Sequence, residues 1–202
     1  ESGLYVFVDV YGHDSFSMAK KMDVDGYKIH SEDLLNTDFI LEVCRSNKIV
    51  MIGVGAAKRI EINELIRYIN DNISHPKIIF MTGVQTFPTP VEAHSIKEVI
   101  DLIDKYSKYG VKVGFSDHVE GDQEEAHILP LMALSGGASV IEKHFILDKS
   151  IGGPDAHFSL DEKEFAEMVK AVRITEQMMG KVDYEMTEKK KKSRQFSRSL
   201  FI

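Results

Sequence analysis

The chain has 202 residues, 43% of them hydrophobic and 28% charged, which is enough for one sizeable core and short for two independent domains. A formal net charge of -7 argues against sequence-independent binding of nucleic acid, which needs clustered Lys and Arg. Cys44 is the single cysteine, so no internal disulfide can form, and no stretch approaches the ~20 apolar residues of a membrane span. The composition favours one domain in a reducing cytoplasm, with neither nucleic acid nor membrane as a partner.

Short apolar runs recur along the chain and predict strands buried on both faces, because they are rich in Val, Ile and Phe without strict alternation. There are six, at residues 4–10, 27–30, 49–54, 77–81, 111–115 and 138–145. Amphipathic helices are predicted where apolar residues recur at i, i+3, i+4 and i+7, starting from Ile62, Ile96 and Phe165. This alternation predicts parallel β/α units, with catalytic groups gathered where strands pass into helices.

The predicted fold class is α/β, a TIM-type β/α barrel. A closed barrel needs eight strands and roughly 250 residues, so six strands predict an incomplete barrel. Residues Glu1-Ser2-Gly3 resemble the end of a helix that leads into a strand. We therefore expect about the first two β/α units of the barrel to be absent. Residues 1–185 are expected to form the partial barrel. Residues 186–202 are expected to be a basic linker, a solvated tail rather than a phosphate or partner contact.

Ionisable groups follow the last two predicted strands. Residues 114–118 are Gly-Phe-Ser-Asp-His, and residues 141–145 are Ile-Glu-Lys-His-Phe. Neighbouring strands lie roughly 4.8 Å apart, so His118 and His144 can reach one ion at about 2.0 to 2.2 Å from each nitrogen. The pattern predicts a divalent metal. Mixed nitrogen and oxygen surroundings favour Mn over Mg, and Zn stays open.

Asp117 and Glu142 are candidate catalytic groups beside these ligands. Strand alternation is expected to point both away from the metal unless a bulge intervenes. Each carboxylate would then accept a proton from the free nitrogen of an imidazole and fix its tautomer. An ordinary salt bridge under the barrel rim is the alternative.

Several motifs in order resemble those of the sialic acid synthase family, from about Tyr5 to the end of the chain. Besides the two histidine groups, they are Tyr27-Lys28-Ile29-His30-Ser31, Phe87-Pro88-Thr89-Pro90, Gly152-Gly153-Pro154-Asp155 and Ser159-Leu160. The resemblance implies a transferase that condenses phosphoenolpyruvate with an N-acylated aminosugar, such as N-acetylmannosamine, to give a sialic or related nonulosonic acid and phosphate. It also implies a small C-terminal antifreeze-like domain after the linker and a homo-oligomer, a dimer, in the complete protein.

The same resemblance implies roles for particular residues. Lys28, as a catalytic and binding group, and Ser31 would handle the phosphate of phosphoenolpyruvate, because a lysine on a buried strand is costly unless it pairs with a charge. Ser116 would contact the same ligand or cap the backbone. Asp155 would bind sugar hydroxyls, although Gly-Pro-Asp also suits a simple turn.

Other positions depart from the family pattern. Gln85 stands where Asn is usual and Phe87 where Tyr is usual; both remain candidate substrate contacts, and the Phe87 ring faces the sugar or closes the barrel rim. Gly53-Val54-Gly55 replaces Ser-Thr-Gly, and Asp9-Val10-Tyr11 replaces Ser-Thr-Pro. A further Lys and a Glu of the family cannot be placed. Two alternatives therefore stay open: a divergent relative that binds sugar or metal without synthesis, and a metal-dependent hydrolase or aldolase.

Overall fold

The computed structural model describes residues 3–182 and 184–197. Six parallel strands form one sheet in chain order. The strands are β1 Phe7–Asp9, β2 Gly26–Ile29, β3 Ile49–Gly53, β4 Ile78–Thr82, β5 Lys112–Ser116 and β6 Val140–Glu142. Each predicted apolar run overlaps one of them, to within one residue at the strand ends, and the sheet is a half-barrel, which confirms the predicted fold class.

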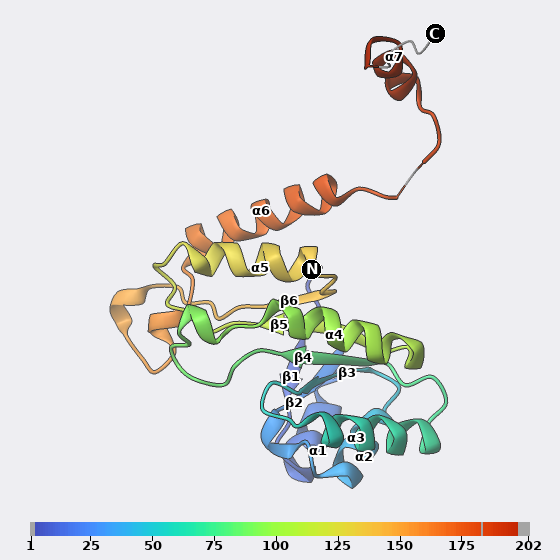
Figure 1. Ribbon diagram of the computed structural model, residues 1–202. Helices are drawn as coiled ribbons and strands as arrows, with labels where there is room; N and C mark the ends of the chain where they lie inside the picture. Colours follow the sequence, from blue (N-terminus) through green and yellow to red (C-terminus); the bar gives the residue numbers. More distant parts are fainter. Residues whose placement is uncertain (1–2, 183, 198–202) are drawn as a thin grey trace.

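Helices connect the strands and cover the sheet (Figure 1). They are α1 His13–Lys21, α2 Thr37–Cys44, α3 Arg59–Asn72, α4 Ile96–Tyr106, α5 Glu125–Ser135, α6 Glu162–Met179 and α7 Glu188–Ser197. Single 3₁₀ turns occur at Ser31–Asp33, Val91–Ala93, Ser107–Tyr109, Lys149–Ile151 and Ala156–Phe158. Helices α3, α4 and α6 contain the predicted stripes; α3 buries all four residues of its stripe, whereas Ile100 of α4 and Val169 of α6 are exposed. Among the described helices, none is both long enough and apolar enough to cross a membrane.

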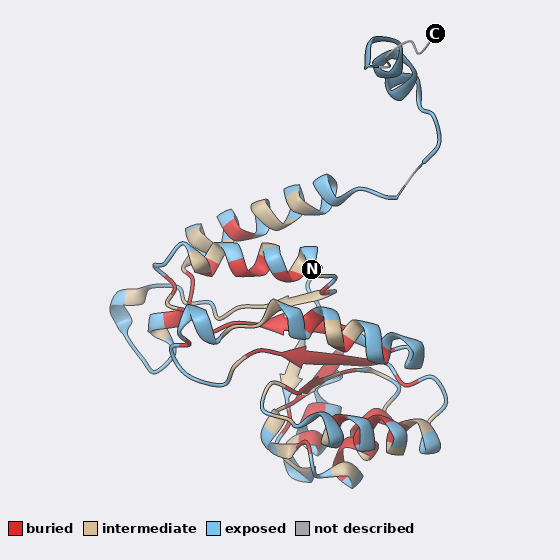
Figure 2. Cartoon of the chain, in the orientation of Figure 1, coloured by how far each residue is buried: buried red, intermediate tan, exposed pale blue. Residues whose placement is uncertain are grey.

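The core lies between the sheet and the covering helices, where Figure 2 shows the buried residues concentrated. Aromatic side chains join the two layers edge to face: Phe16 of α1 packs on Tyr27 of β2 with ring centroids 5.0 Å apart, and Phe80 of β4 packs on Tyr106 of α4 at 5.5 Å. Such edge-to-face pairs are stabilising beyond the area they bury. These contacts hold the strands whose carboxyl ends carry the polar residues.

Two glycines allow the carboxyl ends of the strands to meet backbone to backbone. A Cβ on Gly55 would overlap the carbonyl oxygen of Gly83, and a Cβ on Gly83 would overlap that of Ser116. Gly83 also has φ +155°, which side-chain-bearing residues rarely adopt. The segment that follows β3 therefore lies close to the segment that follows β4, which in turn lies close to the end of β5.

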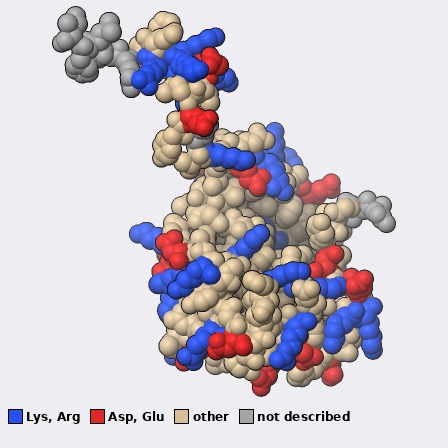
Figure 3. Space-filling model, turned by 90° about the vertical axis from the view of Figure 1, so that its right-hand side faces the viewer, with Lys and Arg blue, Asp and Glu red and all other residues tan. Residues whose placement is uncertain are grey.

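The Lys-rich run forms α7 where the sequence predicted a linker. Its side chains are exposed, as expected of a solvated segment, and Lys and Arg gather on it (Figure 3). Lys, Gln and Arg have high helix propensity, and an i,i+3 pair joins Lys191 Nζ to Glu188 Oε1 at 2.7 Å. Residues 198–202, the end of the predicted linker, lie outside the described residues.

Candidate active site

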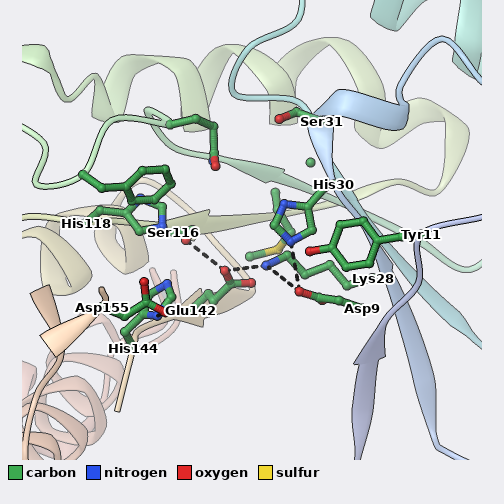
Figure 4. Close-up of a pocket in the computed structure, with 14 residues that line it drawn as sticks. Asp9, Tyr11, Lys28, His30, Ser31, Ser116, His118, Glu142, His144 and Asp155 are labelled. Atoms are coloured by element: carbon green, nitrogen blue, oxygen red, sulfur yellow. Dashed lines mark hydrogen bonds and ion pairs between the residues drawn. The ribbon is translucent and has the colours of Figure 1, made fainter. Parts of the chain in front are cut away.

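A cavity of about 300 Å³ opens at the carboxyl ends of the strands (Figure 4). The predicted site residues that line it are Lys28, Ser31, Gln85, Phe87, Ser116, His118, Glu142, His144 and Asp155. Asp117 is the predicted site residue that does not. The cavity is also lined by Asp9, Tyr11, His30, Gly53 and Met81. The topology thus brings together residues that are up to 146 positions apart, Asp9 and Asp155.

The two histidines face each other across the ends of β5 and β6. Their ring centroids are 5.2 Å apart, and Phe158 packs edge-on against both rings, at 5.5 Å from His118 and 4.8 Å from His144. Nδ1 of His118 lies 3.2 Å from the carbonyl oxygen of Val84. Because a carbonyl only accepts, Nδ1 must carry the proton, which leaves the Nε2 lone pair of the neutral ring free to bind a ligand.

Burial favours the neutral form of both rings. It lowers the pKa of His118, and the neighbouring His144 lowers it further. Burial also lowers the pKa of His144, although the carboxylates of Asp155 and Glu142 oppose the shift. Neutral imidazoles are what a transition metal requires.

The donor set fits a metal that takes only two protein ligands. Within residues 3–182 and 184–197, no group of three or more His, Cys, Asp or Glu side chains is arranged to hold an ion. Asp155 Oδ2 is 3.7 Å from His144 Nδ1, which is ion-pair range rather than a hydrogen bond. A metal on His118 and His144 would therefore keep positions for water and substrate oxygens, as catalytic sites do.

Asp117 does not contact either imidazole. Its side chain is 0% exposed and its Oδ1 lies 2.6 Å from Nζ of Lys143, which is 1% exposed. Strand alternation explains this, because residues 117 and 143 each precede a cavity-facing histidine and so point away from the cavity. The salt bridge, the alternative that the sequence left open, is the contact that forms. The Nδ1–H group of His118 donates its hydrogen bond to the backbone carbonyl of Val84 instead.

Glu142 faces the cavity, and the expectation that alternation turns it away is wrong. It stands two residues before His144, and residues at i and i+2 share a face of a strand. Its Oε1 accepts hydrogen bonds from Lys28 Nζ at 2.7 Å and Ser116 Oγ at 3.0 Å. Burial alone would raise the pKa of Glu142, but the charge and hydrogen bond of Lys28 and the hydroxyl of Ser116 outweigh it and hold that pKa below its usual value.

A second polar cluster on β1 and β2 was not predicted. His30 Nε2 lies 2.9 Å from Asp9 Oδ2, and the Tyr11 ring stacks on His30 with centroids 5.2 Å apart. Asp9 Oδ2 is also 4.0 Å from Lys28 Nζ. The sequence signal for this cluster was position, because Asp9, Tyr11 and His30 each end or follow a strand, as His118 and His144 do.

Loops supply the remaining lining residues. Gln85 and Phe87 follow β4, and the Phe87 ring meets His118 edge-on at 4.5 Å. Asp155 follows Gly152 and Gly153, whose φ angles of +73° and +123° require glycine. At the end of β3, a Cβ on Gly53 would lie 2.8 Å from the backbone nitrogen of Ser31, so the Ser31 backbone packs against Gly53 too closely for a side chain at position 53.

A parallel β/α sheet with its polar side chains at the carboxyl rim defines a TIM-type barrel with a site in the standard place. The NeuB family model matches residues 1–184, and the chain belongs to the NeuB family. It is 34% identical over 199 residues to the pseudaminic acid synthase of Campylobacter jejuni, covering 98% of this chain and 55% of that protein. It is 30% identical to the N,N'-diacetyllegionaminic acid synthase of the same species, covering 83% of this chain and 48% of that protein.

A solved structure agrees with these relatives. The N-acetylneuraminic acid synthetase of Leptospira borgpetersenii, solved with citrate, superposes with a TM-score of 0.82 at 25% identity, covering 95% of this chain and 64% of that one. The chain spans about half the length of the curated relatives it matches. Their names describe synthases of nonulosonic acids.

Proposed function

We propose that the protein condenses phosphoenolpyruvate with an open-chain N-acylated aminosugar to give a nonulosonic acid and inorganic phosphate. One observation carries the proposal: in a NeuB-family half-barrel, the paired histidines His118 and His144 and the Lys28–Glu142 pair line the same cavity. The histidines could hold a metal that binds a sugar carbonyl, and the ammonium of Lys28 could bind an anionic phosphate ester.

The reaction balances without an external oxidant or reductant. C3 of phosphoenolpyruvate forms a bond to the aldehyde carbon of the sugar, whose oxygen takes up a proton and becomes a hydroxyl. Water adds at C2, and the C2–oxygen bond to phosphate breaks. A divalent ion held by His118 and His144, with Mn proposed and Mg or Zn as alternatives, would supply Lewis-acid polarisation of that aldehyde.

The side chains of the cavity bind and orient the reactants. The Lys28 ammonium sits where it can counter the charge of the phosphate, with Ser31 and Ser116 beside it as hydroxyl donors. Glu142 holds Lys28 at 2.7 Å until the anion arrives, and its lowered pKa keeps its carboxylate ionised. Asp155 and Gln85 lie near the histidines to bind sugar hydroxyl or amide groups. Asp117 has no place in this chemistry, because it does not reach the cavity.

The test is release of phosphate from phosphoenolpyruvate on addition of Mn and N-acylated aminosugars. We expect release that depends on both the sugar and the metal, with a nonulosonic acid formed in equal amount. Turnover of a sugar without phosphoenolpyruvate would instead indicate a hydrolase or aldolase and overturn the proposal.

A binding protein without synthase activity is the second candidate. It is favoured by the carboxylates around Lys28, since both Glu142 and Asp9 lie within 4.0 Å of its ammonium and compete with an anion. It predicts that sugar or Mn binds while no phosphate is released in the same assay.

We further propose a homo-oligomer, a dimer, located in the cytoplasm. Strands β1 and β6 end the sheet, and Leu4, Tyr5 and Val6 beside β1 are exposed. Unpaired edges and apolar side chains of this kind favour association. Sedimentation that shows a monomer at all concentrations would overturn the oligomer.

A further inference from the structure

A buried ion pair lies directly behind the two histidines. Asp117 precedes His118 and Lys143 precedes His144, so each charged residue is bonded through the backbone to one candidate ligand. Their side chains meet at 2.6 Å with 0% and 1% exposure. Ser116 pairs with Glu142 in the register of β5 and β6, and one step further along both strands places residue 117 opposite 143.

The ladder between the two strands ends just before the histidines. Beyond Ser116 and Glu142, the two backbones bond to different segments. The carbonyl of His118 accepts from the N–H of Thr89 at 2.9 Å, and the carbonyl of His144 accepts from that of Leu160 at 2.9 Å. Backbone bonds therefore tie the two histidines to separate loops rather than to each other.

Two side-chain links join the strand ends at this level, one on each face of the sheet. On the cavity face, Ser116 Oγ donates to Glu142 Oε1 at 3.0 Å. This link involves Lys28 as well and would be disturbed whenever a ligand displaces Lys28. On the opposite face, Asp117 and Lys143 have no contact with the cavity, so a ligand leaves them undisturbed.

Stability of the fold does not explain this buried ion pair. A buried pair costs desolvation that its attraction often fails to recover, and well-packed apolar residues are commonly as good. The surroundings here are also incompletely paired, because Asp117 Oδ2 and both ring nitrogens of the neighbouring His94 have no hydrogen-bond partner. What the pair offers over apolar residues is a fixed separation, since Oδ1 and Nζ must stay within hydrogen-bond distance.

We propose that Asp117 and Lys143 are positioning residues, which set the spacing of His118 and His144 and so preorganise the two-histidine metal site. This inference rests on the metal site of the proposed function. Neither residue touches substrate or metal, and the effect passes through the two adjoining peptide units.

The experiment removes both charges together, because removal of one would leave an unpaired buried charge and endanger folding. The variant Asp117→Leu/Lys143→Met keeps apolar bulk on both strands. Calorimetry measures its affinity for Mn in the absence of substrates, and thermal unfolding of the metal-free protein measures its stability. We expect an unfolding midpoint at or above that of the parent and a Mn affinity lower by roughly 10- to 100-fold, as for other residues that orient metal ligands.

The matched control is Arg173→Met/Glu176→Leu, which removes an exposed ion pair of 2.8 Å on α6 and changes the charge in the same way. It should leave Mn affinity unchanged. If the first variant does not fold, Asp117→Asn/Lys143→Met replaces it, with the same expectation. Parent-like Mn affinity in a folded variant that lacks the ion pair would overturn the inference.

The outcome is separable from that of the proposed function. Mn binding is measured without phosphoenolpyruvate or sugar, so a protein without synthase activity still gives an answer. A parent protein that binds no Mn would overturn both the metal site and this inference, whatever the result of the phosphate-release assay.

Discussion

Two walls of the cavity differ in the charged groups that they carry. The metal wall, formed by Ser116, His118, Glu142 and His144 at the ends of β5 and β6, sets two imidazoles against the ring of Phe158. The anion wall, formed by Asp9, Lys28 and His30 at the ends of β1 and β2, holds one ammonium between carboxylates, at 4.0 Å from its own Asp9 and 2.7 Å from Glu142 of the metal wall.

This difference separates two parts of the proposed reaction. The metal wall has the residues that the family motifs predict, in a geometry that suits a borderline metal. The anion wall has Gly53 and Asp9 where the family pattern has serines, so an incoming phosphate must compete with carboxylates that already hold Lys28. We therefore expect the walls to respond differently to substitution.

The largest effect is expected at the metal wall. Either His118→Ala or His144→Ala leaves one imidazole for the ion, so tight Mn binding should be abolished while helical circular dichroism stays largely unchanged. Calorimetry with Mn measures the loss, and His13→Ala, whose side chain is 72% exposed on α1, is the control. Full Mn affinity in the double His118→Ala/His144→Ala variant would contradict the metal site.

The next effect is expected at Lys28. Lys28→Met keeps the aliphatic bulk and removes the charge, so affinity for phosphoenolpyruvate should fall by roughly tenfold to a hundredfold or more, as for a charge-assisted contact of about 1.5 to 3 kcal/mol. Lys28→Arg should not rescue fully, because a planar fork meets phosphate differently from a compact ammonium.

The control for Lys28 is Lys112→Met, at the exposed amino end of β5, away from the rim. The substitution of Lys28 also removes the positive partner of Glu142, and its effect on that carboxyl is a rise in pKa. Unchanged binding of phosphoenolpyruvate in Lys28→Met would make Lys28 structural and remove the anion wall from the proposed reaction.

A smaller effect is expected when pH falls, because protons compete with the metal for imidazole. Two histidines of ordinary pKa, about 6.5, would each be half protonated at pH 6.5, and metal affinity would drop about fourfold there. Burial lowers the pKa of both His118 and His144, so less than half of each ring is protonated at pH 6.5 and the loss of affinity there should be smaller than fourfold. Calorimetry from pH 8 to 5 measures it, and a fourfold loss already at pH 6.5 would contradict the lowered pKa of the two ligand rings.

The sheet could be predicted from the sequence because parallel strands covered on both faces lie in short apolar runs, and each of the six strands overlaps such a run. Helices α2 and α5 were missed because neither shows an apolar stripe. Buried residues run almost unbroken through Phe39–Cys44, and α5 is apolar on most sides with Pro130 inside it. Helix α1 is short and largely polar, with only Phe16 and Ala19 buried. Periodicity detects a helix only when one face is solvated.

The candidate site could also be predicted only in part. The strand-end positions of His118, Glu142 and His144 were visible in the sequence, and so was their meeting at one rim. The partners were not, because a sequence does not say that Lys28 reaches Glu142 across the cavity or that Lys143 closes on Asp117 behind it. Glu142 was also predicted to point away from the cavity, which is wrong because it stands two residues before His144 and so shares its face of the strand.

The smallest effect is expected at Asp9, and it has the opposite sign. Asp9→Asn keeps a hydrogen-bond acceptor for His30 and removes a negative charge 4.0 Å from Lys28 Nζ. Because the Asp9 side chain is 40% exposed, solvent screens this charge, and its removal should be worth only ~0.5 kcal/mol, or about two- to threefold tighter binding of phosphoenolpyruvate. Binding isotherms at low and high salt measure it, and the gain should shrink as salt rises. A Mn affinity equal to that of the parent shows that the metal wall is untouched. Weaker binding of phosphoenolpyruvate in Asp9→Asn would show instead that the carboxylate of Asp9 favours anion binding through His30. The carboxylates of the anion wall would then not compete with phosphate, contrary to the comparison of the two walls.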